Sequence, residues 1–189
     1  MRHTNPARIA AASAFALSIL SGCSTYDAAT SYLFSNDALQ CPDAVILANT
    51  AVLPAFDPAK GADPSGVIYT ARMTDVSTRC DYAKREFTAD ARLVISYTAT
   101  RPPGGEAAKF RVPYFVAVTN EGVIADKQNF WLNMEFQKGA TSISGSEAVD
   151  SVIVKVDKAK KPYEYHLIVG FQLTKAQIDY NKKMGQDAP

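Results

Sequence analysis

The sequence contains few of the residues that build catalytic or metal-binding sites. Of its 189 residues, three are cysteine and two are histidine, and beyond the N-terminal segment the histidine is His166. The sequence has no Gly-x-Ser-x-Gly, His-Glu-x-x-His or Ser-x-x-Lys motif and no glycine-rich phosphate loop. A histidine without a second histidine or a carboxylate pair at defined spacing is typical of a surface or packing residue. We therefore expect no enzymatic activity, no metal site and no cofactor.

The sequence also lacks an excess of charge of either sign. Residues 1–22 carry Arg2 and Arg8 and no acidic side chain, so the remaining 167 residues have 18 basic and 19 acidic side chains, a net charge of −1. A nearly neutral domain is not typical of proteins that bind nucleic acid. Nor would its charge alone hold it on anionic lipid.

The chain has no apolar run long enough to cross a bilayer, which takes roughly 20 residues. The run at residues 9–20 is shorter and follows a basic N-terminus. A basic segment followed by a short apolar segment is typical of a signal peptide. We therefore expect residues 1–22 to be a signal peptide.

The apolar run ends in Leu20-Ser21-Gly22-Cys23, which resembles the lipobox of bacterial lipoproteins. The resemblance implies cleavage between Gly22 and Cys23, a diacylglycerol thioether on the Cys23 sulfur and an acylated, palmitate-type amine. Cysteine is needed because a thiolate is the nucleophile. Two or three acyl chains anchor a protein far more firmly than one. The alternative is an ordinary secretory signal that ends near a cysteine.

The residue after the lipobox cysteine is Ser24 and not aspartate. In the family that the lipobox resembles, this implies export to the outer membrane, where the protein would face the periplasm; the inner membrane and the cell surface remain alternatives. With the domain that follows, the chain resembles small envelope lipoproteins of proteobacteria.

Residues 23–40 are expected to form a tether and residues 41–189 a single domain. The cluster Tyr32-Leu33-Phe34 is unusually apolar for a tether. Either it packs back on the domain, or it meets the membrane surface or a partner.

Seven runs rich in β-branched and aromatic residues predict strands. They cover residues 44–53, 67–80, 87–101, 110–118, 123–136, 148–157 and 163–173. This pattern predicts an all-β fold, an antiparallel sandwich like those of immunoglobulin and fibronectin-III domains. Pro113 cannot donate to a ladder, so it predicts an edge strand or a bulge.

A short helix is predicted at the C-terminus. Thr174 and Gln177 form a capping box, and the helix should continue to about Lys183 and stop at Gly185.

Cys41 and Cys80 are expected to form a disulfide, because the exported compartment is oxidising. If residues 44–53 and 67–80 pair as neighbours, a register with Leu53 opposite Ile68 also places Cys41 opposite Cys80, at a distance that suits a disulfide. The alternatives are two free buried thiols or, less favoured, a metal site.

Trp131 is predicted to lie on the outer face of its strand, because Phe130, Leu132, Met134 and Phe136 alternate with it. Together with three tyrosines it could form an aromatic binding patch; the alternative is that these residues complete the core. The tyrosines are Tyr69, Tyr97 and Tyr114.

A second candidate surface is basic. Lysines cluster around residues 155–161 and could touch lipid headgroups or an anionic polymer; otherwise they keep a sheet edge soluble.

The sequence thus favours a lipid-anchored, non-enzymatic interaction module that binds another envelope protein. The membrane is a partner through the lipid, and nucleic acid is not expected. The alternative is a small-ligand or glycan binder with a concave pocket around Trp131.

Overall fold

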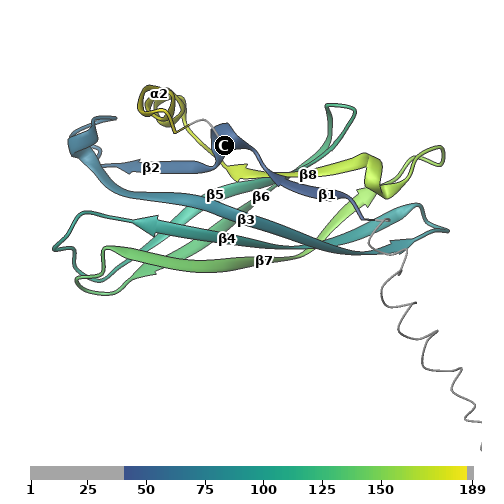
Figure 1. Cartoon of the computed structure of the whole chain (residues 1–189), viewed down its shortest axis with the longest axis horizontal. Helices are drawn as coiled ribbons and strands as arrows, with labels where there is room; N and C mark the ends of the chain where they lie inside the picture. The colour runs from purple at the N-terminus through teal and green to yellow at the C-terminus, as the bar shows by residue number, and fades with distance from the viewer. Residues whose placement is uncertain (1–40, 187–189) are drawn as a thin grey trace, which may run out of the picture. The chain divides into compact units, whose positions relative to one another are not determined.

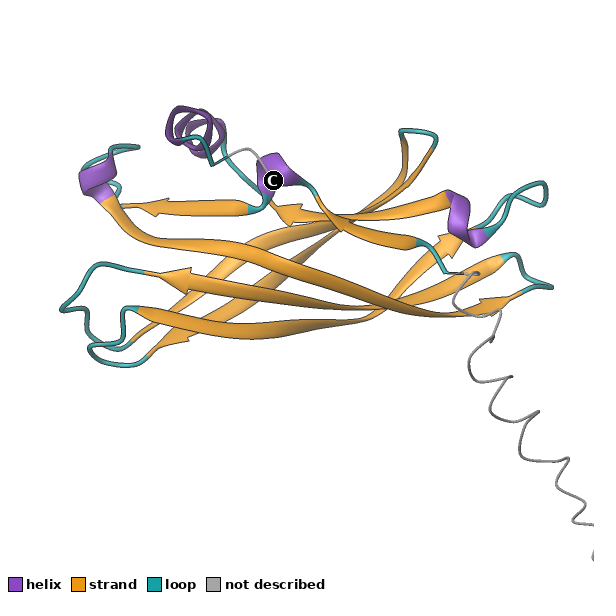
Figure 2. Cartoon of the chain, viewed as in Figure 1, coloured by secondary structure: helices purple, strands orange, loops and turns teal. Residues whose placement is uncertain are grey.

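The structure, a computed structural model, describes residues 41–186, which form two four-stranded β-sheets and a C-terminal helix (Figures 1 and 2). Neighbouring strands are antiparallel except β1 and β8, which are parallel. The order in sheet A is β1 (Asp43–Ile46), β8 (Tyr165–Phe171), β5 (Ala108–Asn120) and β6 (Val123–Phe136). The order in sheet B is β2 (Val52–Phe56), β3 (Val67–Ala83), β4 (Thr88–Thr100) and β7 (Ser142–Lys155). The all-β prediction is confirmed.

The run at residues 44–53, predicted as one strand, is two strands in different sheets. β1 pairs with β8 in sheet A, the chain then turns through the 3-10 helix η2 (Ala48–Thr50), and β2 pairs with β3 in sheet B. The prediction was wrong because a continuous apolar run carries no signal for a change of sheet. The described residues therefore contain eight strands and not seven.

Several strand boundaries also differ from the prediction. β7 begins at Ser142, six residues before the predicted start at residue 148. Tyr163 belongs to the 3-10 helix η4 (Pro162–Glu164) and not to the last strand. A further 3-10 helix, η3 (Pro64–Gly66), precedes β3.

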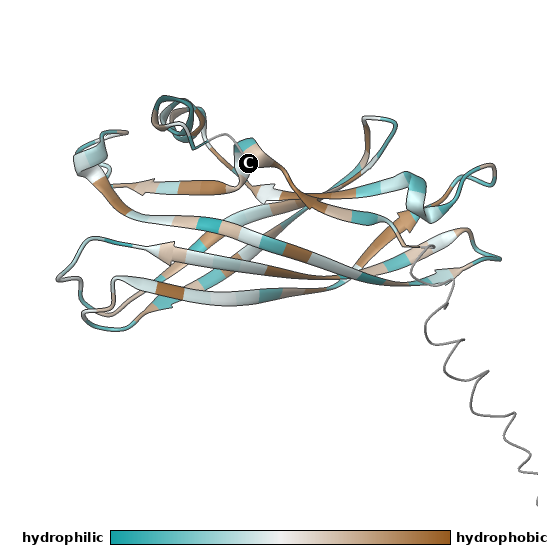
Figure 3. Ribbon diagram, in the orientation of Figure 1, coloured by the Kyte–Doolittle hydropathy of each residue, from teal (hydrophilic) through white to brown (hydrophobic). Residues whose placement is uncertain are grey.

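The core lies between the two sheets, and both contribute to one cluster of buried side chains. Hydrophobic and hydrophilic residues alternate along the strands in Figure 3, as expected when one face of a strand is buried. In β6 this alternation buries Leu132, Met134 and Phe136 and exposes Trp131, as predicted, whereas Phe130 is only half-buried.

Pro113 does not lie on an edge strand, because β5 pairs with both β6 and β8. The Gln172 N–H donates to the Pro113 carbonyl (2.9 Å), one residue beyond the end of β8. The N and C=O of a strand residue point to the same side. The proline nitrogen therefore faces the last rung of the β5–β8 pairing, and only one terminal hydrogen bond is lost.

The C-terminal helix α2 (Lys175–Met184) begins and ends as predicted. Thr174 and Gln177 form the capping box, and Gly185 ends the helix with φ +65°. The helix covers the outer edge of β2: the Gln177 Nε2 group donates to the Pro54 carbonyl and the Asn181 Nδ2 group to the Val52 carbonyl, each at 2.7 Å. These bonds satisfy carbonyls that an edge strand would otherwise leave unpaired.

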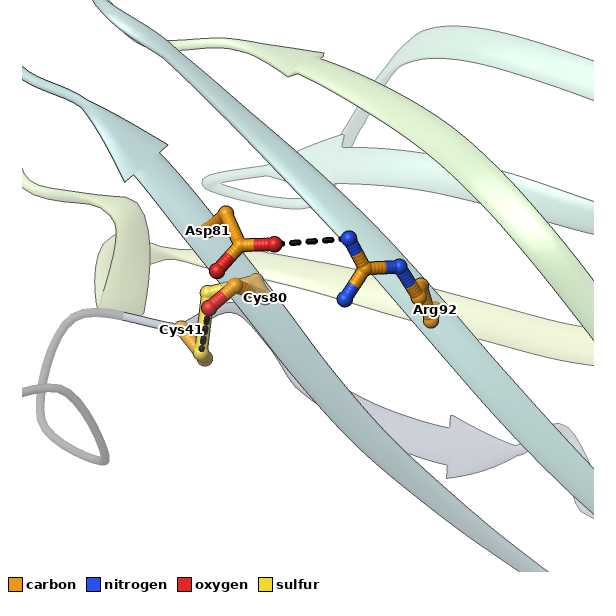
Figure 4. Close-up of a disulfide and its surroundings, with 4 residues drawn as sticks. All are labelled: Cys41, Cys80, Asp81 and Arg92. Atoms are coloured by element: carbon orange, nitrogen blue, oxygen red, sulfur yellow. Dashed lines mark hydrogen bonds and ion pairs between the residues drawn. A yellow bond between two sulfur atoms is a disulfide. The ribbon is translucent and has the colours of Figure 1, made fainter.

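The sulfur atoms of Cys41 and Cys80 lie 2.10 Å apart, in a disulfide (Figure 4). The predicted pair is therefore present, but the predicted register is wrong. Leu53 lies opposite Ala71, and Cys41 precedes β1 and not β2. The disulfide links the segment that leads into sheet A to β3 of sheet B, beside the Asp81–Arg92 ion pair of 2.7 Å.

Candidate functional site

Trp131 is exposed on the outer face of sheet A, with 48% of its surface accessible. The Arg111 guanidinium carbon lies 4.6 Å from the centroid of its ring, a cation–π contact. Asn129 and Asn133 flank Trp131 on the same face of β6 and are also exposed. We call Trp131, Arg111, Asn129 and Asn133 the tryptophan platform.

The pairing of β5 with β6 assembles this platform. Pro113 lies opposite Trp131 and Arg111 opposite Asn133, so the arginine is a diagonal neighbour of the tryptophan. The β5–β6 turn has two residues, Glu121 (φ 53°) and Gly122 (φ 78°). Both have positive φ, as a tight hairpin turn of this kind requires.

A bulge near that turn decides which residues meet. Asn120 pairs with Val123 and Thr119 with Ile124, but Val118 pairs with Asp126, so Ala125 is an extra residue. Without the extra residue, Trp131 would lie opposite Val112, whose side chain is in the core. With the extra residue, it lies opposite Pro113 on the outer face of the sheet.

Between Trp131 and β8, the Lys127 side chain lies over the outer face of sheet A. The Lys127 ammonium lies 4.4 Å from the ring centroid of Phe115 and donates to the Gln172 side-chain carbonyl (3.1 Å). Phe115 itself is buried. The accessible aromatic surface of this region is therefore that of Trp131.

The platform lies on an edge strand. β6 pairs with β5 alone, and from Gln128 to Phe136 the pairing is regular. The other edges differ: β1 has four residues, β2 is covered by α2, and β7 contains a register shift near Asp150. β6 thus presents a long, regular edge next to an exposed aromatic residue.

Tyr69, Tyr97 and Tyr114 do not join Trp131 in a patch, and that expectation is corrected. All three are buried on the inner faces of their strands. Tyr114 stacks on Phe130 with ring centroids 5.3 Å apart. Burial raises the pKa of each of the three phenols, as expected for core tyrosines.

Glu147 is the acidic residue that sequence reasoning missed. It occupies an inward position of β7, between Gly145 and Val149, and is half-buried. Burial raises the pKa of its carboxyl group, and its charge in turn raises the pKa of Tyr97 and Tyr114. An inward charge on an edge strand discourages pairing with another chain.

Three of the surface clefts in the described part of the chain are lined by charged residues, and Trp131 lines none of these three. A cleft of about 270 Å³ lies between the edges of the sheets and includes Asp126, Gln128 and Lys155. A cleft of about 550 Å³ lies at Glu86–Thr88. A cleft of about 400 Å³ is lined by residues 109–111 and 133–135, which include Arg111 and Asn133 of the tryptophan platform. This cleft adjoins the platform, but Trp131 is not among the residues that line it.

His166 is exposed on β8, opposite Asp43 and Thr119. Within residues 41–186, no three His, Cys, Asp or Glu side chains are grouped closely enough to hold a metal ion. In the same residues no helix has the length and apolarity needed to cross a membrane. The lipobox residues Gly22 and Cys23, and the tether with Tyr32-Leu33-Phe34, lie outside the described residues.

Comparison with known proteins gave no match to a protein family, to a curated protein or to a solved structure.

Proposed function

We propose that the protein is a lipid-anchored, non-enzymatic binding module of the bacterial cell envelope, exported to the outer membrane and facing the periplasm. The lipobox at residues 20–23 supports the anchor. The exposed tryptophan platform of the protein, on a regular edge strand, supports binding of another envelope protein.

The platform combines two features of protein recognition. Tryptophan and arginine are the residue types most often found at the energetic centre of interfaces. An unpaired edge strand can accept an extended segment of a partner through backbone hydrogen bonds. Holding both partners at one membrane raises their effective concentration, so a small contact suffices.

A glycan-binding function is favoured by Asn129 and Asn133, whose amides could bind hydroxyl groups beside the Trp131 ring. It is the weaker proposal, because the three tyrosines that would complete a pocket are buried in the core.

We propose that the relation to immunoglobulin and fibronectin-III domains is one of architecture alone. The seven-stranded immunoglobulin arrangement has the order ABED in one sheet and CFG in the other. Here the orders are β1-β8-β5-β6 and β2-β3-β4-β7.

Replacing the lipidated residue, Cys23→Ser, tests the anchor. We expect loss of the acyl chains, seen by mass spectrometry, and release from the membrane fraction. A Cys23→Ser protein that still partitions with membranes would contradict the anchor.

Trp131→Ala tests the binding surface, with Val94→Ala as the matched control. Val94 has 46% of its surface accessible, close to the 48% of Trp131, but lies on the outer face of sheet B. We expect Trp131→Ala to lose the partner that wild type retains in mild detergent, and Val94→Ala to keep it. Equal retention by both variants would refute this surface.

A further inference from the structure

The described chain begins at one end of the domain, which we call the anchor-side end. It consists of the β3–β4 turn (residues 84–87), the β5–β6 turn (residues 121–122) and the β7–β8 loop (residues 156–164). Asp43 at the start of β1 lies opposite His166, which lies opposite Thr119, one residue before Asn120 ends β5. Figure 1 shows the described chain beginning close to the β7–β8 loop and the β3–β4 turn.

The most exposed large apolar side chains of residues 41–186 lie at this end. They are Val123, Ile124 and Tyr163, with 69%, 61% and 55% of their surface accessible. Every other large apolar side chain of the described residues is less exposed, Trp131 included. Because burial of such side chains is favourable, contact of this end with an apolar surface would be stabilising.

The two segments that carry these side chains are fixed to one another. The Lys160 ammonium donates to the Glu121 carboxylate (2.9 Å) and to the Asn120 side-chain carbonyl, and the Asn120 amide donates to the Glu164 carbonyl (2.8 Å). The Tyr165 hydroxyl accepts from the Asp157 N–H (2.9 Å). The apolar side chains are therefore presented by a pre-organised surface, which lowers the entropic cost of docking.

The charges of this end are nearly balanced. Its basic residues are Lys84, Arg85, Lys158, Lys160 and Lys161. Its acidic residues are Glu86, Glu121, Asp157 and Glu164. With five cations and four acids, the end would neither be drawn strongly to anionic lipid nor repelled by it. Apolar contact and not net charge is what this surface offers.

We propose that the anchor-side end rests on the lipid bilayer, with Val123, Ile124 and Tyr163 in the interfacial region. This inference depends on the lipid anchor of the proposed function. Residues 24–40 limit the distance between Cys23 and Cys41 to roughly 60 Å. Within that distance the acyl chains keep the domain beside the membrane, so a weak apolar contact is enough to orient it.

Docking at this end would set the distance between the tryptophan platform and the membrane surface. Trp131 lies opposite Pro113, seven residues from the Asn120 end of β5. At about 3.3 Å per residue, this places Trp131 roughly 23 Å along the strand from the β5–β6 turn. The platform would then face a periplasmic partner and not the lipid.

The test uses the full-length, lipidated protein in vesicles of phosphatidylethanolamine and phosphatidylglycerol. The Val123→Cys variant carries an environment-sensitive fluorophore, and lipids with a quencher near the headgroup report contact. Ile124→Cys is the second labelled position. Lys138→Cys, exposed between β6 and β7 at the opposite end, is the matched control.

We expect the label at residue 123 or 124 to shift to shorter wavelength and to lose emission to the quencher, at low and at high salt. The label at residue 138 should show neither change. Water-exposed labels at residues 123 and 124, in protein whose mass shows the acyl chains, would overturn the inference and leave the anchor standing. Protein without acyl chains would overturn the anchor itself, and contact that salt abolishes would overturn the apolar mode of docking.

Discussion

Cys80, on the inner face of β3 in sheet B, is joined to Cys41, which lies two residues before the first strand of sheet A. The bond therefore fixes the start of the described chain to sheet B, although that segment leads into sheet A. The two cysteines are 39 residues apart. Closing a loop of that length stabilises the folded state by about 4 kcal/mol in the chain-entropy account.

The double variant Cys41→Ala/Cys80→Ala should lower the free energy of unfolding by about 3–4 kcal/mol, because the unfolded chain regains the freedom of the open loop. Urea denaturation of the variant beside wild type measures the difference. Free thiols in purified wild-type protein, or equal stability of the two proteins, would contradict this account.

Gly170→Ala should destabilise the domain by about 1–3 kcal/mol, the usual cost of overpacking. A Cβ atom at residue 170 would come within 1.9 Å of the Thr50 Oγ1 atom and 3.1 Å of the Phe115 ring. Removing the hydroxyl in Gly170→Ala/Thr50→Ala should restore part of the loss. Thermal unfolding of the single and double variants checks this, and an unchanged melting temperature of the single variant would show that η2 does not pack on β8 in this way.

Glu147→Gln should change how stability depends on pH. Burial raises the pKa of the Glu147 carboxyl group above its ordinary value of 4.5, so the fold disfavours its charged form. Wild type then loses stability as the pH rises through the raised pKa, whereas below the ordinary value this residue costs nothing. The variant should gain stability over wild type at about pH 7 and much less at about pH 4. A difference that does not vary with pH would show that this carboxyl group is not perturbed.

Asn181→Ala should destabilise the domain by about 1–3 kcal/mol, because the Val52 carbonyl on the edge of β2 loses its partner. Asn181 is buried and its neighbour Lys182 is exposed, so Lys182→Ala is the control and should leave stability nearly unchanged. Chemical denaturation of both variants measures the contrast. Equal effects would mean that the helix does not protect this edge.

The sequence predicts what depends on local pattern. The capping box of Thr174 and Gln177 needs only residues close together in the chain, and the helix begins where it predicts. The alternation along β6 likewise places Trp131 on the outer face. In contrast, residues 110–118 are almost continuously apolar, so alternation could not reveal that Tyr114 points into the core.

The parts that the sequence could not predict depend on pairing across strands. If β5 and β6 are paired outward from the turn at Glu121-Gly122 without a bulge, Trp131 lies opposite Val112, a core residue. The extra residue Ala125 shifts the partner of Trp131 to Pro113 and brings Arg111 beside Trp131. The Cys41–Cys80 pair was predicted from the oxidising compartment. The strand register given in its support is absent from the structure, because the chain changes sheet between β1 and β2. Bulges and sheet changes have weak local signals, and they decide which side chains meet.

The most direct test of the proposed function is photo-crosslinking in intact cells, with a photoreactive amino acid in place of Asn129 or Asn133, beside Trp131. Position 94, on the outer face of sheet B, is the matched control. The account predicts a discrete crosslink to an envelope protein from positions 129 and 133, lost when Trp131→Ala or Cys23→Ser is added, and none from position 94. Crosslinks that are equal at all three positions, or that persist without Trp131, would contradict it.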